Sequence, residues 1–355
     1  MPPAAPGVAL PFVTADLPGS GGALRATPED FRVDELPAYL PSGAGPHLYV
    51  HVEKRGRTTR DVLRTLARAL GVPERDAGYA GLKDRHAVTT QWLSFLAARD
   101  PDPAALAADG VRVLAISRHA NKLRPGHARG NVFSIAVRDG DLARARACAA
   151  ALAERGLPNL FGPQRFGAAG DNAALGRALL LGADTPAARR AARDRFVRRL
   201  AISAYQSLLF NRWLAERMAD GLFAAALAGD VLKKLDTGGL FTCEDPAVDG
   251  PRIARFEVSP AGPMFGHALR PAAGEAAARE ARLLAAEGIA LADFARGGGE
   301  AEGTRRAARL RVAAEVAPLE DGPGYRARFE LPRGSYATVV LRELVKGETE
   351  LPDED

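Results

Sequence analysis

Cysteine is scarce in this sequence of 355 residues, with Cys148 and Cys243 lying far apart. Two isolated thiols exclude both a disulfide framework and a zinc site made of paired cysteines. Long apolar runs are also lacking, because no window approaches the roughly 18 uninterrupted apolar residues that a membrane-spanning helix needs. The opening stretch MPPAAPGVALPF has no basic segment followed by an apolar run, so it does not predict a secretory signal. We therefore expect a cytoplasmic protein without a membrane anchor.

Motifs for bound cofactors are missing as well. The glycine-rich stretches GSGGAL and GPGYRARF do not have the spacing of a dinucleotide fingerprint or of a phosphate-binding P-loop. The six histidines are scattered, and His119 and His127 have no nearby carboxylate or cysteine, so we expect no metal site. The serines lack the glycines of a nucleophile elbow. Among the familiar nucleophiles a carboxylate remains, and we expect an activity without a cofactor.

Acidic residues are absent between Asp109 and Asp139, although the net charge of the whole chain is only +5. The interval VRVLAISRHANKLRPGHARGNVFSIAVR predicts a strand from Val111, a long basic loop and a second strand that begins near Val132. Clustered basic side chains bind a polyanion by displacing its counterions, so this segment is a candidate RNA contact. A solvated loop is the alternative. The candidate contact residues are Arg118, Lys122, Arg124 and Arg129.

Helices and strands are mixed without a regular period. The stretch TTRDVLRTLARALG predicts an amphipathic helix that Thr58 or Thr59 caps, and DLARARACAAALAERG and GEAAAREARLLAAEGIALADFA predict alanine-rich helices. ARLRVAAEV and GYRARFEL each alternate as a strand. Six arginines between Arg189 and Arg199 belong to a long helical stretch, where they are explained as a solvated face. The mixture favours an α+β architecture over a doubly wound parallel sheet.

The short stretch GLKDRH, from Gly81 to His86, lies between two predicted strands. Asp84 would therefore sit at the connection, where rigid strands can present a carboxylate for nucleophilic or general-base chemistry. Asp is also a common turn residue, because its side chain bonds the following backbone amides. The local pattern alone favours the ordinary turn. Since Lys83 and Arg85 point away from Asp84 in an extended chain, a basic partner of Asp84 is expected from another segment.

The stretch GLKDRHAVTTQWLSF resembles the active-site signature of the TruD family of tRNA pseudouridine synthases, in which Gly-x-Lys-Asp is followed by Thr-x-Gln. Five further segments fall in the same order as in that family. They are EDFRVDELP, LPNLFGPQRFG, AISAYQSLLFN, GTRR and FELPRGSYATVVLRE. The resemblance extends from residue 29 to residue 343 and so covers nearly the whole chain.

The resemblance implies isomerisation of uridine to pseudouridine in tRNA without a cofactor, at position 13 of the D-arm in known members. Asp84 matches the catalytic aspartate of the family. Phe31, Asn159, Phe161 and Phe329 match positions that line the uridine pocket, and Gln164 and Arg165 match supporting positions. Aromatic stacking and an amide that reads the polar edge suit a flipped base. Core packing of Phe31 and Phe329, and a turn at Asn159, are the alternatives.

The resemblance also implies the architecture. We expect a pseudouridine synthase core with a mixed, largely antiparallel sheet, formed by residues 1–184 and 307–355. A family-specific inserted domain is expected at 185–306, and the tRNA is expected between the two parts. No obligate protein partner is evident.

Two other functions remain possible on the sequence. A non-catalytic RNA-binding protein or tRNA folding helper would use the same basic surface but would not need the intact GLKD. A carboxylate-dependent hydrolase would need a second carboxylate beside Asp84, and neither Asp76 nor Glu53 is a convincing candidate.

Overall fold

The computed structural model describes residues 10–167 and 170–347. Contacts within the chain divide these residues into two compact units. Unit 1 holds residues 10–17, 151–167, 170–311 and 338–343, and unit 2 holds residues 18–150, 312–337 and 344–347. Unit 1 contains all of the predicted inserted domain, residues 185–306, but that domain boundary stays a prediction. No helix of the described residues is long and apolar enough to cross a bilayer.

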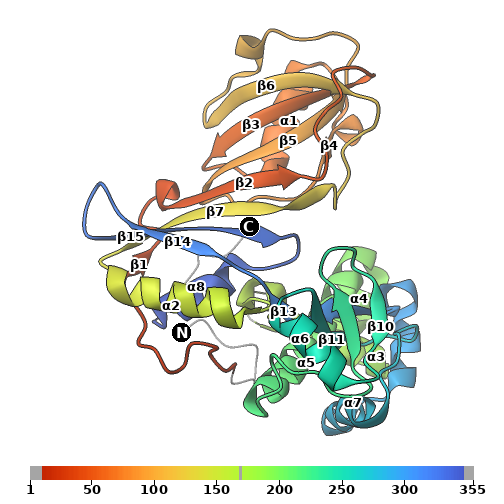
Figure 1. Cartoon of the computed structure of the whole chain (residues 1–355). Helices are drawn as coiled ribbons and strands as arrows, with labels where there is room; N and C mark the ends of the chain where they lie inside the picture. Colours follow the sequence, from red (N-terminus) through yellow and green to blue (C-terminus); the bar gives the residue numbers. More distant parts are fainter. Residues whose placement is uncertain (1–9, 168–169, 348–355) are drawn as a thin grey trace. The chain divides into compact units, whose positions relative to one another are not determined.

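Unit 2 is built on one nine-stranded sheet with the order β14-β15-β7-β2-β5-β3-β6, in which β1 also pairs with β7 and β4 with β5 (Figure 1). Only the β2–β5 pair is parallel among the described strands of this sheet, so the predicted mixed, largely antiparallel sheet is confirmed. Its strands are β1 (Ala23–Leu24), β2 (Phe31–Pro37), β3 (His47–Arg55), β4 (Gly78–Tyr79), β5 (Val88–Leu96), β6 (Val111–His119), β7 (Ala128–Arg138), β14 (Ala314–Pro318) and β15 (Gly324–Pro332).

Helix α1 (Thr59–Ala69) covers part of this sheet and confirms the predicted amphipathic helix. The Thr58 side chain accepts the backbone N–H of Asp61, which satisfies one of the free amides at the start of the helix. Val62 and Leu66 are fully buried against the β3 and β5 side chains Val50 and Leu93. The periodic apolar face thus fixes the helix on β3 and on β5, the strand that follows the GLKDRH stretch.

Unit 1 combines helices with a four-stranded sheet of order β10-β9-β11-β12 and a short β8–β13 pair. Helices α2 and α8 contribute residues to both units. The helices are α2 (Leu142–Arg155), α3 (Asn172–Leu181), α4 (Pro186–Arg193), α5 (Arg195–Ala219), α6 (Pro246–Ala254), α7 (Gly274–Ala286) and α8 (Ala337–Val345). The strands are β8 (Leu157–Pro158), β9 (Val231–Lys234), β10 (Leu240–Thr242), β11 (Val258–Met264), β12 (Thr304–Ala307) and β13 (Arg309–Leu310). Short 3₁₀ segments occur at Pro28–Asp30, Glu74–Asp76, Pro103–Leu106, Pro163–Phe166 and Leu291–Ala301.

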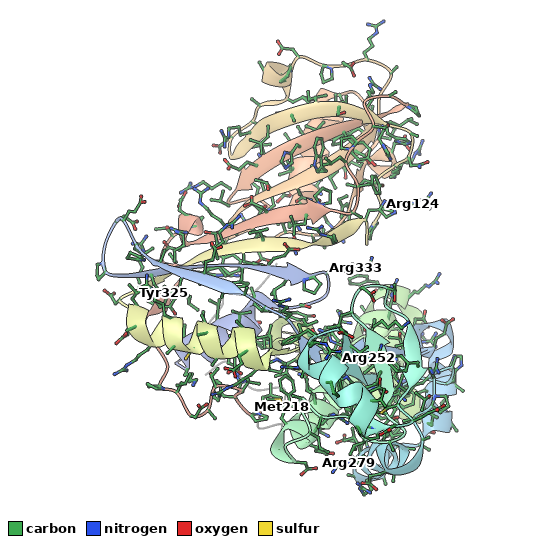
Figure 2. The ribbon with its side chains drawn as sticks, in the orientation of Figure 1. Arg124, Met218, Arg252, Arg279, Tyr325 and Arg333 are labelled. Carbon is green, nitrogen blue, oxygen red and sulfur yellow. The ribbon has the colours of Figure 1, made fainter. Side chains whose placement is uncertain are left out.

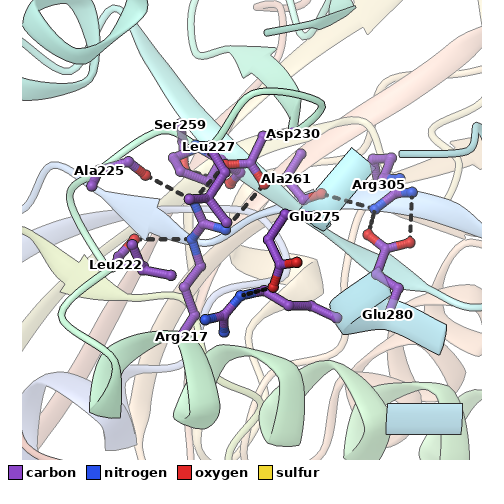
Figure 3. Close-up of polar contacts among 12 residues, drawn as sticks. Arg217, Leu222, Ala225, Leu227, Asp230, Ser259, Ala261, Glu275, Glu280 and Arg305 are labelled. Atoms are coloured by element: carbon purple, nitrogen blue, oxygen red, sulfur yellow. Dashed lines mark hydrogen bonds and ion pairs between the residues drawn. The ribbon is translucent and has the colours of Figure 1, made fainter. Parts of the chain in front are cut away.

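Two buried ion pairs lie inside unit 1 (Figure 3). Arg217 on α5 binds Asp230 through both terminal nitrogens, at 3.0 Å and 2.5 Å, and also donates to the carbonyls of Leu222 and Ala225. Arg305 on β12 binds Glu280 on α7. Each guanidinium is paired and further hydrogen-bonded, as a charge removed from water must be.

Four local predictions are wrong. The stretch from Arg189 to Arg199 is not one helix, because α4 ends at Arg193 and α5 begins at Arg195, with Asp194 extended between them. ARLRVAAEV is not one strand, because β13 pairs with β8 in unit 1 whereas β14 joins the large sheet of unit 2. Strand β7 begins at Ala128 rather than near Val132, because Ala128 already pairs with Pro37. The predicted helix from Gly274 ends at Ala286, where Gly288 adopts a positive φ of 59° and Ile289 donates to the carbonyl of Leu284.

Candidate active site

Asp84 lies on the loop that joins β4 to β5, as the sequence predicts. Its side chain is 20% exposed, and its Oδ2 atom accepts a hydrogen bond from Nη2 of Arg25 at 3.2 Å. The Arg25 side chain is only 4% exposed, and its guanidinium carbon stands 4.1 Å from the centre of the Phe31 ring. The basic partner of Asp84 therefore comes from a distant segment, as expected. Arg25 therefore contacts both the Asp84 carboxylate and the face of the Phe31 ring.

The backbone of Asp84 is held by a side chain of β3. Lys54 is buried, and its Nζ donates to the Asp84 carbonyl oxygen at 2.5 Å. Burial lowers the pKa of Lys54 to about 8, and the nearby charge of Asp84 partly opposes that effect. Two cations thus face this residue, one at its side chain and one at its main chain.

Two other residues of the signature, Lys83 and Gln91, fix the loop. Lys83 extends its side chain to Glu35, 3.1 Å between Nζ and Oε2, and its backbone N–H donates to Thr59 Oγ1 at 2.9 Å. Gln91 accepts from Thr59 Oγ1 at 2.9 Å and donates to the Gly81 carbonyl at 3.3 Å. Burial raises the pKa of Glu35, and the charge of Lys83 opposes that rise. Both motif residues therefore position the turn rather than contact the Asp84 carboxylate.

Phe31 and Phe329 lie in one aromatic row of unit 2, on β2 and β15. Phe133 on β7 connects them, with an edge contact to Phe31 at 6.3 Å and a stacked contact to Phe329 at 5.5 Å between ring centres. All three side chains are buried among the described residues. This row is continuous with Arg25 and Asp84, but contact of Phe31 or Phe329 with a base stays a prediction.

Asn159 and Phe161 lie together in unit 1, directly after β8. Asn211 on α5 binds both sides of the Phe161 backbone, accepting its N–H at 2.8 Å and donating to its carbonyl at 2.9 Å. Arg306 on β12 places its guanidinium 4.0 Å from the Phe161 ring centre and donates to the Asn159 carbonyl at 2.9 Å. The segments LPNLFGPQRFG, AISAYQSLLFN and GTRR therefore meet at this point.

The four candidate RNA contacts of the basic segment differ in their surroundings. Arg118 binds Asp100 at 2.7 Å and the Ala97 carbonyl, and Lys122 donates to the Arg75 carbonyl at 2.6 Å. Arg129 is exposed and reaches Glu330 at 3.4 Å, and Arg124 is exposed on the loop that precedes β7 (Figure 2). Arg124 and Arg129 therefore offer their charge to solvent more fully than Arg118 does. RNA contact at all four stays a prediction.

Comparison with known proteins assigns the family. The family model for tRNA pseudouridine synthase D (TruD) matches residues 8–198 and 184–344. The tRNA pseudouridine synthase D of Anaeromyxobacter dehalogenans (strain 2CP-C) is 81% identical over 98% of this chain and 99% of its own length. A protein of the same name from Thermus thermophilus is 45% identical over 95% of this chain and 92% of its own. This chain belongs to the TruD family.

A crystal structure agrees with this assignment. A Methanosarcina mazei protein assigned as a tRNA pseudouridine synthase D superposes with a TM-score of 0.76 at 25% identity, over 96% of this chain and 97% of that one. The α+β fold of this TruD-family protein is thereby confirmed. In the described part of the chain, no group of three His, Cys, Asp or Glu side chains is arranged to hold a metal ion.

Two side chains of this TruD-family site were not singled out from the sequence as neighbours of Asp84. Arg25 lies only four residues before the EDFRVDELP segment, and that proximity is the one signal that could have suggested it. Lys54 belongs to a basic group in front of α1, where charge alone does not distinguish a buried lysine from solvated neighbours. Both contacts join segments far apart in the sequence, so they follow only from the tertiary structure.

Lys54 gives the stability of the protein a predicted pH dependence. Its pKa is about 8 in the folded chain against an ordinary 10.5, so between these values the unfolded chain holds more protons. Its contribution to the free energy of unfolding must therefore rise with pH in this window. We expect the stability of the wild type minus that of Lys54→Met to increase from about pH 7.5 to about pH 10, measured by urea unfolding. A stability difference between the two proteins that does not change with pH would contradict the lowered pKa of Lys54.

Proposed function

We propose that this protein converts uridine to pseudouridine in tRNA, with Asp84 as the catalytic carboxylate. The observation that carries the proposal is the constrained, partly exposed Asp84 carboxylate, which Arg25 pairs at 3.2 Å in a chain of the TruD family. In this isomerisation the N1–C1′ bond breaks and the C5–C1′ bond forms, while C5 loses a proton and N1 takes one up. Atoms balance without a cofactor.

Asp84 has two chemical routes at the ribose. It either attacks C1′ as a nucleophile or takes a proton from C2′ to give a glycal-like intermediate. Both routes need a carboxylate that has a fixed position and is accessible to the ribose. The contacts of Arg25 and Lys54 fix its position. The partial exposure of the side chain makes it accessible.

We further propose uridine 13 of the D-arm as the target, in the cytoplasm, with Phe31, Asn159, Phe161 and Phe329 around the base. Pseudouridine mapping by carbodiimide modification and primer extension tests this directly. Purified protein should produce one new stop one nucleotide 3′ to position 13 of a transcript with uridine there, and none when cytidine replaces it. A protein that binds tRNA but yields no stop would be a binding protein, and a stop elsewhere would refute the proposed position.

Phe161→Ala should lower the single-turnover rate of pseudouridine formation by about 10²-fold, because a misplaced base loses its reactive alignment. The ring contacts Arg306 and the Phe210 ring, so folding must be checked as well. Phe161→Tyr provides the matched control, since it keeps an aromatic face. Wild-type rates in the alanine variant would return Phe161 to a packing role.

A further inference from the structure

A basic pocket of about 690 Å³ lies inside unit 1, at the junction of α4 and α5. Its lining is Ala192, Arg193, Arg195, Arg198, Arg199, Ser203, Gly299 and Glu300. Four guanidinium groups therefore face one carboxylate. A second hollow of about 410 Å³ shares Arg193 and continues along α4 past Arg189 and Arg190, with Asp194 as the one acidic residue of its lining. The positive surface is thus longer than a single pocket.

Glu300 neutralises only part of this charge. Its two oxygens stand 3.6 Å from Arg195 and 3.6 Å from Arg198, and Arg198 also donates to the Arg296 carbonyl at 2.9 Å. Within residues 10–167 and 170–347, the guanidinium groups of Arg193 and Arg199 have no hydrogen bond or ion pair. Two arginines are therefore oriented by the protein, and two are uncommitted.

An exposed aromatic ring lies among these arginines. Phe196 is 69% exposed, and it is the one aromatic residue among the exposed large apolar side chains of the described residues. It lies in the first turn of α5, where the Asp194 side chain accepts the backbone N–H groups of Phe196 and Val197. Arg193 and Arg199 are each three residues away from it along the chain. Aromatic rings interleaved with arginines are the composition of surfaces that hold single-stranded nucleic acid.

The pocket is joined to Phe161 through side chains of the same unit. Ser203 lines the pocket and accepts a hydrogen bond from Arg165. Arg165 also donates to Ser207 at 3.2 Å, and its guanidinium carbon stands 5.8 Å from the Phe161 ring centre. A nucleotide at Phe161 would thus bring its neighbouring phosphates toward the arginines.

We propose that the surface formed by Arg193, Arg195, Phe196, Arg198 and Arg199 binds the tRNA strand beside the target nucleotide. The arginines contact phosphate oxygens, and the Phe196 ring stacks on an unpaired base. The identity of the polyanion rests on the proposed function. This surface replaces the interpretation of these arginines as an ordinary solvated face, because four of them line one pocket beside a single carboxylate and two of them have no partner among the described residues.

The test compares two double variants of equal charge change, Arg193→Gln with Arg199→Gln, and Arg255→Gln with Arg282→Gln as the control. The control arginines are exposed in unit 1 and pair with surface glutamates. Fluorescence anisotropy with labelled tRNA should show that the first pair lowers the salt slope by about 1.4 to 1.8, or about 0.7 to 0.9 per lost phosphate contact. If the double variant and the wild type bind tRNA equally at 1 M salt, this change in slope makes the variant bind about 14- to 30-fold more weakly than the wild type at 0.15 M salt.

The control pair should bind as the wild type does. Equal slopes for the first pair and the wild type would overturn the proposal. Pseudouridine mapping with the wild type separates the proposed activity from the proposed surface. If the proposed activity is wrong, the wild type forms no pseudouridine. With active wild type, an unchanged first pair contradicts this surface alone.

Phe196 has a separate signature. Phe196→Ala should weaken tRNA binding by about 5- to 150-fold without changing the salt slope, because stacking releases no counterions. Phe196→Trp should retain wild-type binding. Because Phe196 is exposed, we expect neither substitution to unfold the protein. Circular dichroism of both variants checks that they are folded. Unchanged binding in the alanine variant would remove the ring from the RNA surface.

Discussion

Replacing Asp84 by Asn is expected to lower the single-turnover rate of pseudouridine formation on the order of 10⁴-fold, while tRNA binding changes by less than about threefold. The amide has nearly the shape of the carboxylate, so Arg25 and Lys54 keep a residue of similar size between them. It supplies neither a nucleophilic oxygen nor a base for the ribose. The loss should therefore fall on the chemical step.

Asp76→Asn is the matched control for this substitution. Asp76 lies in the 3₁₀ segment Glu74–Asp76 of the same unit and was the nearest alternative carboxylate in the sequence. It should leave the rate unchanged. Rapid mixing of excess enzyme with tRNA, followed by quantification of pseudouridine in nuclease digests, measures the rate, and anisotropy measures binding. Full activity of Asp84→Asn would remove Asp84 from the mechanism.

Arg25→Ala is expected to lower kcat by about 10²-fold with a smaller change in KM, because it frees the carboxylate that Arg25 now orients. Arg25 contacts Asp84 and Phe31 rather than the reacting atoms, so it is a positioning residue. Removing one partner of a mostly buried ion pair also leaves the other charge without compensation. The effect on kcat should consequently exceed that of any exposed arginine of the basic loop.

The conservative variant separates positioning from simple loss of folding. Arg25→Lys keeps the cation, so it should recover much of the activity without restoring the planar contact with Phe31. Arg144→Ala, an exposed change in the same unit, should leave kcat unchanged. Thermal unfolding of all three variants reports their stability. Equal kcat values for Arg25→Ala and the wild type would show that the ion pair has no part in catalysis.

Local sequence rules predicted those parts of the fold whose causes are local. The helix at Thr59–Ala69 follows from its cap at Thr58 and its apolar period, and β15 follows from the alternation of Tyr325, Ala327, Phe329 and Leu331. The break between β13 and β14 does not follow from local sequence rules, because it occurs where the chain passes from unit 1 to unit 2. No residue type marks that passage.

The site was predictable to a different degree. The local pattern placed Asp84 at a turn, and only the resemblance of several separated segments gave that turn a chemical meaning. The functions of its neighbours depend on contacts that no short window contains. Arg25 reaches Asp84 across 59 positions, and Asn211 reaches Phe161 across 50. The resemblance therefore predicts which positions matter, and the structure shows which contacts each of them makes.

The central claim is that this protein changes the attachment of a tRNA uracil to the ribose C1′ from N1 to C5, and that Asp84 is the catalytic carboxylate. Tritium release from tRNA labelled at uracil C5 measures that exchange most directly, since the C5 hydrogen must leave when the new bond forms. The wild type should release one equivalent of tritium per tRNA, and Asp84→Asn should release none in the same time. No release by the wild type, or equal release by Asp84→Asn, would contradict the account.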